Sequence, residues 1–124
     1  MKTLEIQIKS REEFDREFIE AFKNAQAGKR VKPKSGVYFE NLEAVRNLLT
    51  EKRLELLHMI RTRNPRSIYR LAKLTHRNFR NVYDDVQTLK TYGLIQFGKP
   101  AKKRQKSSRN LSVPYQAINI HAWI

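Results

Sequence analysis

Residues 67–95, SIYRLAKLTHRNFRNVYDDVQTLKTYGLI, decide the fold of this chain. They predict two short helices joined by a tight turn. Ser67 is a good N-cap for the first helix, because its hydroxyl accepts a hydrogen bond from a free backbone N–H. The dipeptide Thr75-His76 forms the turn, and the second helix starts at Asn78 or already at His76. Apolar residues recur in it at helical spacing and define a core face: Phe79, Val82, Val86 and Leu89.

The flanking residues predict a compact α+β domain around this helix pair. Gly93 is suited to end the second helix, since glycine readily adopts the left-handed conformation. Residues 94–97 alternate in hydrophobicity and predict a first wing strand, residues 100–110 a basic wing loop, and residues 111–120 a returning strand. Upstream, Asn41 precedes one helix and Thr50 caps another. Leu54, Leu57 and Ile60 form the apolar stripe of that second helix, and Leu71 and Leu74 of the following one point inward.

The N-terminal residues predict a separate strand and helix. Thr3 to Ile8 alternates and indicates a half-buried strand. Ser10 then caps a helix that carries Phe14, Phe18, Ile19 and Phe22 and ends at Gly28. The fold class expected is therefore α+β: a winged helix-turn-helix domain over residues 37–124 with a strand-helix appendage over residues 1–36. The appendage serves either for dimerisation or partner binding, or as additional core.

The charge is strongly positive and unevenly distributed. The 124 residues hold 26 Lys and Arg against 12 Asp and Glu, a formal net charge of +14. Residues 1–51 are nearly balanced, whereas residues 52–124 carry sixteen basic and three acidic residues. This asymmetry indicates a polyanionic partner for the second half. Nucleic acid is favoured over a lipid surface, because the basic residues lie within a folded pattern.

Several chemical classes find no support in the sequence. The chain has no cysteine, which excludes disulfides and thiolate metal sites. No signal peptide or membrane-spanning segment is visible, so a cytoplasmic, nucleoid-associated protein without a membrane contact is expected. Asp84-Asp85 is a candidate acid-base or metal pair, but salt bridges to Arg77, Arg80 or Arg70 are the favoured interpretation. No cofactor, no metal and no enzymatic activity are expected.

The start of the second helix offers side chains suited to reading bases. Arg matches guanine and Asn matches adenine in the major groove, and the first turn of such a helix enters the groove deepest. The base-contact candidates are Arg77, Asn78, Arg80 and Asn81. The alternative is a solvated helix face that contacts nothing.

Further residues are candidates for the DNA backbone, where contacts supply salt-dependent affinity rather than sequence preference. Around the helix pair these are Arg66, Ser67, Tyr69, Arg70, His76 and Tyr83. In the wing they are Lys99, Lys102, Lys103, Arg104, Lys106 and Arg109. The alternative for the wing is a solubilising tail.

Three segments carry a resemblance to a known family. They are Tyr38-Phe39-Glu40, the run LTEKRLELLHMIRTRNPRSIYRLAKLTHRNFRNVYDDVQTLKTYGLI, and VPYQAINI, with RNFRNVYDDV (77–86) the most specific part. Residues 38–120 resemble small prokaryotic winged helix-turn-helix proteins described as predicted transcriptional regulators, distantly similar to the MarR type. The resemblance implies a frequent association with a small toxin, and hence an antitoxin that represses its own operon.

The sequence thus predicts a sequence-specific regulator, a repressor that binds double-stranded DNA as a homodimer. A homodimer is expected because one recognition helix reads only a few base pairs. A cognate toxin is the further partner that the resemblance implies. The main alternative is a sequence-tolerant architectural nucleic-acid-binding protein. A nuclease is the third hypothesis, and it would need a carboxylate or histidine cluster elsewhere in the chain.

Overall fold

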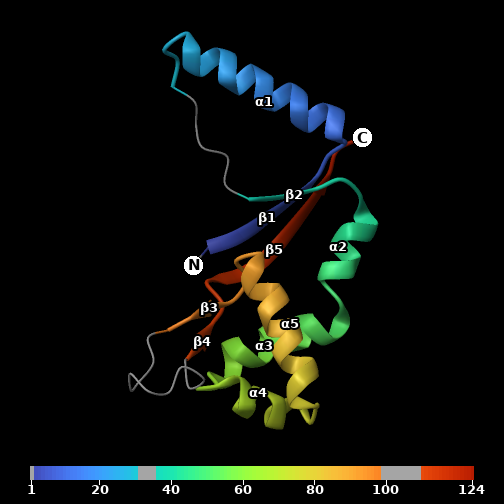
Figure 1. Ribbon diagram of the computed structural model, residues 1–124, viewed down its shortest axis with the longest axis vertical. Helices are drawn as coiled ribbons and strands as arrows, with labels where there is room; N and C mark the ends of the chain where they lie inside the picture. The colour runs from blue at the N-terminus through green and yellow to red at the C-terminus, as the bar shows by residue number, and fades with distance from the viewer. Residues whose placement is uncertain (1, 31–35, 99–109) are drawn as a thin grey trace. The chain divides into compact units, whose positions relative to one another are not determined.

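The computed structural model describes residues 2–30, 36–98 and 110–124, and within them the fold is α+β (Figure 1). Two compact units are present. Of the described residues, the helical unit comprises residues 47–98 and 110–116 together with Lys2, and the sheet unit comprises residues 3–30, 36–46 and 117–124. This division differs from the expected boundary after residue 36. Strands after that point pair with the N-terminal strand, which draws both 36–46 and 117–124 into the sheet unit.

The helical unit consists of three helices and a short two-stranded sheet. These are α3 (Glu51–Arg63), α4 (Ile68–Thr75), α5 (Phe79–Thr91), β3 (Gln96–Phe97) and β4 (Leu111–Ser112). The helices pack on one another, and α3 also contacts β4. The largest fully buried side chains of the unit come from all three helices and from the segment after α5: Leu56, Ile60, Leu71, Val82, Val86, Leu89, Leu94 and Ile95.

Side-chain caps set the ends of these helices as predicted. The Thr50 hydroxyl accepts a hydrogen bond from the Arg53 N–H, and the Ser67 hydroxyl accepts one from the Arg70 N–H. Asn78 caps α5, which decides between the two expected starts of that helix. Gly93 has a φ of +78° directly after the C-cap of α5, the left-handed conformation that glycine adopts without strain.

Some expected core positions are exposed. Leu54, Leu74 and Phe79 each leave more than a third of their surface open to solvent, whereas Leu56, which was not part of the expected stripe, is fully buried. Leu57 and Ile60 are buried as expected, so the core face of α3 differs from the expected one only in that Leu56 takes the place of Leu54. Phe79 lies instead beside Tyr83 on the surface of α5, with ring centroids 6.0 Å apart.

The expected returning wing strand over residues 111–120 is two strands. Only β4 pairs with β3, antiparallel, with Gln96 opposite Ser112 and Phe97 opposite Leu111. After Pro114 a new strand, β5 (Tyr115–Ala122), joins the other sheet. Proline has no backbone N–H to donate and so interrupts the ladder at this point.

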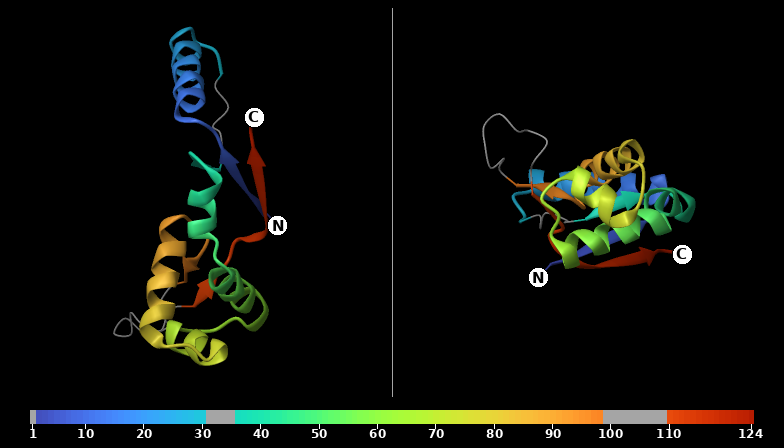
Figure 2. Two further views of the ribbon diagram at one scale, coloured as in Figure 1. Left: turned by 90° about the vertical axis from the view of Figure 1, so that its right-hand side faces the viewer. Right: turned by 90° about the horizontal axis from the view of Figure 1, so that it is seen from below.

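The sheet unit is built on three strands in the order β2-β1-β5. β1 (Lys2–Ile8) is central and pairs in parallel with β2 (Val37–Phe39), with Ile6 opposite Val37. On its other side β5 runs in the same direction (Figure 2). The alternating residues Leu4, Ile6 and Ile8 are buried on one face, which confirms the predicted half-buried strand.

The opposite face of this sheet is polar and ties the two long strands together. Glu5 lies 2.7 Å from the Nε2 atom of His121 and accepts a hydrogen bond from the Asn119 amide at 3.3 Å. The Trp123 indole N–H donates to the Gln7 side chain at 3.3 Å. These contacts hold the C-terminal strand in register with β1.

Two helices complete the sheet unit. α2 (Leu42–Leu48) follows β2 and buries Val45, and the Asn41 side chain accepts a hydrogen bond from the Ala44 N–H at its start. α1 (Arg11–Gln26) begins after Ser10, whose hydroxyl accepts a hydrogen bond from the Glu13 N–H as predicted. Unlike the other long helices, α1 has no buried residue.

Candidate nucleic-acid interface

The connection between α4 and α5 is a turn of three residues, His76, Arg77 and Asn78. His76 adopts the left-handed conformation, with φ 54° and ψ 39°. The Arg77 N–H donates to the Ala72 carbonyl, and the Thr75 hydroxyl donates to the Leu71 carbonyl, so the end of α4 is closed by local bonds. A short turn with these bonds fixes the start of α5 beside α4 (Figure 1).

A half-buried ionic network holds this arrangement. The Asp85 carboxylate on α5 accepts from Arg77 Nη2 at 2.8 Å and from Arg53 Nε at 3.2 Å. Arg53, on α3, also donates through Nη1 to the carbonyls of Asn47 and Leu48. One carboxylate therefore links α3, the turn and α5, and it orients Arg77 as expected of the Asp84-Asp85 pair.

Arg77 does not fit the expected role of a base contact. Only 17% of its side chain is exposed, its guanidinium points to Asp85, and its Nη1 atom is buried without a hydrogen-bond acceptor among the described residues. Moving the Arg77 guanidinium away would leave the partly buried Asp85 carboxylate with one cation fewer, and this costs free energy. In this conformation Arg77 positions the turn rather than facing a base.

Arg80 and Asn81, by contrast, are open to solvent in the first turn of α5. The Arg80 side chain is 76% exposed and lies 3.5 Å from Asp84, an ion pair that is itself largely exposed. Exposed pairs of this kind contribute little free energy, so Arg80 is free to exchange Asp84 for another acceptor. Its guanidinium also lies 5.7 Å from the ring centroid of Tyr83.

Asn78 is only partly available, because its side chain caps α5. Its Oδ1 atom accepts a hydrogen bond from the Arg80 N–H at 2.7 Å. The side-chain amide still has donors to offer. Of the four base-contact candidates, the structure thus leaves Arg80 and Asn81 free, Asn78 half engaged and Arg77 engaged.

The exposed side of α4 adds a second polar cluster. Lys73 Nζ lies 4.7 Å from the ring centroid of Tyr69, one helical turn away. A hydrogen bond from Lys73 to the phenol oxygen, together with the Lys73 charge, lowers the pKa of Tyr69 below its ordinary value of 10.0. The Arg70 charge acts in the same direction. A phenol hydroxyl and two cations therefore face solvent together.

The backbone-contact candidates lie on the surface around these clusters. Arg66, Arg70 and His76 are exposed, and Tyr83 is open beside Arg80. The Ser67 hydroxyl is used as the N-cap of α4 and is half-buried. All six wing candidates lie outside the described residues: Lys99, Lys102, Lys103, Arg104, Lys106 and Arg109.

Two residues of this region were missed by the sequence reasoning. Arg53 is separated from Asp85 by 32 positions, and no local spacing reveals that pairing. Lys73, in contrast, stands four residues after Tyr69, a spacing that brings two side chains together on one helix face. That signal was available in the sequence.

Comparison with known proteins places the helical unit in a family. The family model HVO_A0114 matches residues 48–120, which is more than half of the chain. The chain belongs to the HVO_A0114 family. No curated protein and no solved structure matches it. The matched residues contain all of α3, α4, α5, β3 and β4, so the HVO_A0114 match covers the elements that carry Arg80, Asn81 and the Asp85 network.

Metal-ligand groups and membrane-spanning helices are both absent from the described residues of this HVO_A0114 protein. Among the described residues, no group of three or more His, Asp or Glu side chains is placed to hold a metal ion. Within the same residues, no helix has the length and apolar character needed to cross a membrane.

Proposed function

We propose that the helical unit is a winged helix-turn-helix that binds duplex DNA sequence-specifically and represses transcription as part of a homodimer. α4 and α5 are its helix pair, α5 enters the major groove with its first turn, and β3 and β4 flank the wing. The observation that carries the proposal is the availability of Arg80 and Asn81, both exposed at the start of a rigidly held helix. Arg and Asn are the side chains that pair bidentately with guanine and adenine.

The rigid support of α5 favours reading of sequence over loose attachment. A recognition helix must be held in place so that its side chains meet base edges at defined positions. Here the Asp85 network and the capped three-residue turn fix α5 against α3 and α4. Arg66 and Arg70 then supply charge near the start of α4 and Lys73 in its last turn, where phosphates are the expected acceptors.

The role as an antitoxin that represses its own operon rests on the resemblance to toxin-associated regulators alone. Co-expression with the product of the adjacent gene, followed by co-purification and a growth assay, tests it. The alternative of a sequence-tolerant architectural protein is supported by the many basic residues of the wing, because contacts of Lys and Arg with phosphates supply affinity without sequence preference.

The test of the proposal is fluorescence anisotropy of the full chain on its own upstream DNA and on a scrambled duplex of the same length, at near-physiological salt. A sequence-specific regulator prefers the upstream DNA by about 10³-fold or more. Equal affinity for both duplexes contradicts the proposal and supports the architectural alternative.

Matched variants sharpen this test. Arg80→Ala should cost about 1–3 kcal/mol on the cognate site and little on the scrambled duplex, because the lost contact is to a base. Lys90→Ala is the control, since Lys90 lies over the Phe97 ring, 4.5 Å from its centroid, near the other end of α5. An Arg80→Ala variant that keeps its full preference for the upstream DNA removes Arg80 from the reading surface.

A further inference from the structure

The longest helix of the sheet unit leaves its apolar side uncovered. Phe14, Phe18, Ile19 and Phe22 on α1 are all exposed, Phe18 to 65% and Phe22 to 57%. Residues 14, 18 and 22 are spaced by four and therefore form one stripe along the helix. The first turns of α1 are anchored by Phe14 against Tyr38 and by Glu17 to Lys9 at 2.6 Å. Contiguous apolar surface of this kind marks an interaction site.

We propose that this stripe, Phe14, Phe18 and Phe22, is the homodimer interface, formed by the α1 helices of two copies packed antiparallel about a two-fold axis at Phe18. The proposal takes up the homodimer of the proposed function and names its surface. The stripe is symmetric about Phe18, so the antiparallel arrangement brings Phe18 against its own equivalent and Phe14 against Phe22 of the second copy. A two-fold interface requires such self-complementarity.

The charges of α1 favour this register. The charged residues that border the stripe are Arg11 and Asp15, which helical spacing places within about 60° of Phe18. When Phe18 lies on the axis, Arg11 is level with Ala25 of the second copy and Asp15 with Ala21. No charged residue between Arg11 and Ala25 is level with a residue of like charge. In a parallel pair Arg11 and Asp15 would instead each lie level with their own equivalents, and like charges at the border of the interface repel.

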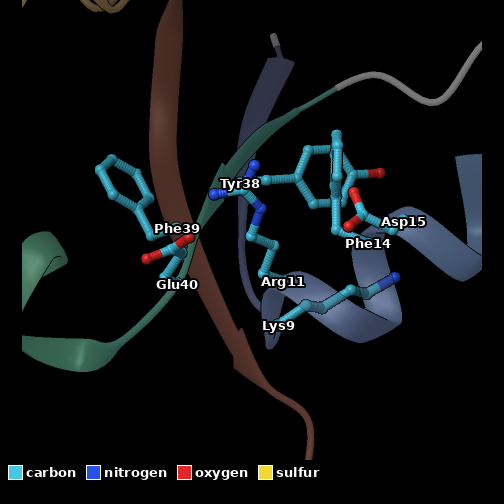
Figure 3. Close-up of a pocket in the computed structure, with 7 residues that line it drawn as sticks. All are labelled: Lys9, Arg11, Phe14, Asp15, Tyr38, Phe39 and Glu40. Atoms are coloured by element: carbon cyan, nitrogen blue, oxygen red, sulfur yellow. The ribbon is translucent and has the colours of Figure 1, made fainter.

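A pocket at the anchored end of the stripe provides a place for the incoming aromatic ring. It has a volume of about 300 Å³ and is lined by Lys9, Arg11, Phe14, Asp15, Tyr38, Phe39 and Glu40 (Figure 3). Arg11, Phe14 and Asp15 lie on the same side of α1 as the rest of the stripe, by helical spacing. Phe22 of the second copy therefore meets the pocket next to Phe14. A cavity of about 150 Å³ already accommodates benzene, so the space suffices.

Sedimentation of the full chain without DNA tests the interface. The wild-type protein should sediment at twice 14.7 kDa. Phe18→Asp places two carboxylates against each other on the axis and should raise the dissociation constant of the dimer by at least about 30-fold, the effect of a hot-spot residue. Because Phe18 is exposed, circular dichroism should show an unchanged fold. Glu12→Gln, exposed and outside the stripe, is the control and should leave the dimer intact.

Disulfide trapping tests the register, and the absence of cysteine from the chain makes it direct. Phe18→Cys should cross-link two copies under mild oxidation. Phe14→Cys and Phe22→Cys should stay uncross-linked as single variants but cross-link as a double variant. Cross-links in all three single variants would establish a parallel pair and overturn the proposed arrangement.

A wild-type chain that sediments as a monomer, or a dimer that Phe18→Asp does not weaken, overturns the interface. These results are separable from the DNA experiments, since no DNA is present. A dimer without DNA preference contradicts the sequence-specific DNA binding of the proposed function and leaves the α1 interface standing. A DNA-specific monomer contradicts the homodimer and the α1 interface together, and a DNA-specific dimer that Phe18→Asp does not weaken contradicts the α1 interface alone.

Discussion

Asp84 and Asp85 are neighbours in the chain with different surroundings. Asp85 is half-buried between Arg53 and Arg77, whereas Asp84 lies on the surface beside Arg80. Successive helical residues point about 100° apart, so one faces the interior and the other solvent. The sequence therefore predicted correctly that the pair bonds to arginines, but it did not distinguish Arg77, which turns inward, from Arg80, which stays free.

Replacing the two aspartates should separate their roles. Asp85→Ala should lower the free energy of unfolding by about 2–4 kcal/mol, because it leaves two partly buried guanidinium groups without their carboxylate. Asp84→Ala should change it by at most about 0.5 kcal/mol, as expected for an exposed pair. Urea denaturation followed by circular dichroism measures both. Equal effects of the two variants would contradict the network described around Asp85.

Tyr69 should report on Lys73 by titration. Lys73 lowers the Tyr69 pKa by favouring the phenolate, so Lys73→Met should raise that pKa toward 10.0. A phenolate repels phosphate, so a DNA complex that uses Tyr69 should weaken as the pH rises through the lowered pKa of Tyr69. In Lys73→Met the same weakening should begin at a higher pH. Ultraviolet difference spectra measure the ionisation of Tyr69 in the wild type and in Lys73→Met. Tyr69→Phe identifies which part of the spectrum belongs to Tyr69. A Tyr69 titration unchanged by Lys73→Met contradicts the assigned cause.

Among the secondary-structure elements, the starts of the helices were predicted from the sequence more accurately than the pairing of the strands. Thr50 and Ser67 each cap the helix that they were expected to cap, and Asn78 caps the helix whose start was expected at Asn78 or at His76, because a cap acts within three residues. The pairing of β5 with β1 is set by residues more than a hundred positions apart, such as Glu5 and His121. Alternation alone predicts a strand but not its neighbour in the sheet.

The start of β2 depends on a glycine. Gly36 has a φ of +133°, and a Cβ there would lie 2.6 Å from the Glu5 carbonyl oxygen in β1. Gly36→Ala should therefore push β2 away from β1 and cost about 1–3 kcal/mol of stability. Gly28→Ala is the control for left-handed strain alone, because Gly28 has φ +76° but open space around it. Thermal unfolding measures the stability lost in each variant. Equal losses in Gly36→Ala and Gly28→Ala would exclude a contribution from the close approach of a Cβ to the Glu5 carbonyl oxygen.

For the whole molecule, the uneven charge remains the main indication of a nucleic-acid partner. The wing basic residues lie outside the described part of the chain, so their role is a prediction from sequence. Neutralising Lys102, Lys103 and Arg104 should lower the affinity for all DNA sequences by a similar factor. It should also make the slope of log affinity against log salt concentration less steep, by about 0.9 per lost phosphate contact. Anisotropy titrations across a salt series measure the slope, and an unchanged slope would mean that these residues make no phosphate contact.

The order in which the two units are interleaved along the chain also bears on synthesis. The helical unit is encoded between the two parts of the sheet unit, and β5 is the last strand made. On the ribosome the apolar residues of β1 therefore wait until residues 117–122 emerge, while residues 47–116 are already complete. We expect the helical unit to fold first during translation, and the sheet to be completed only after residues 117–122 have been synthesised.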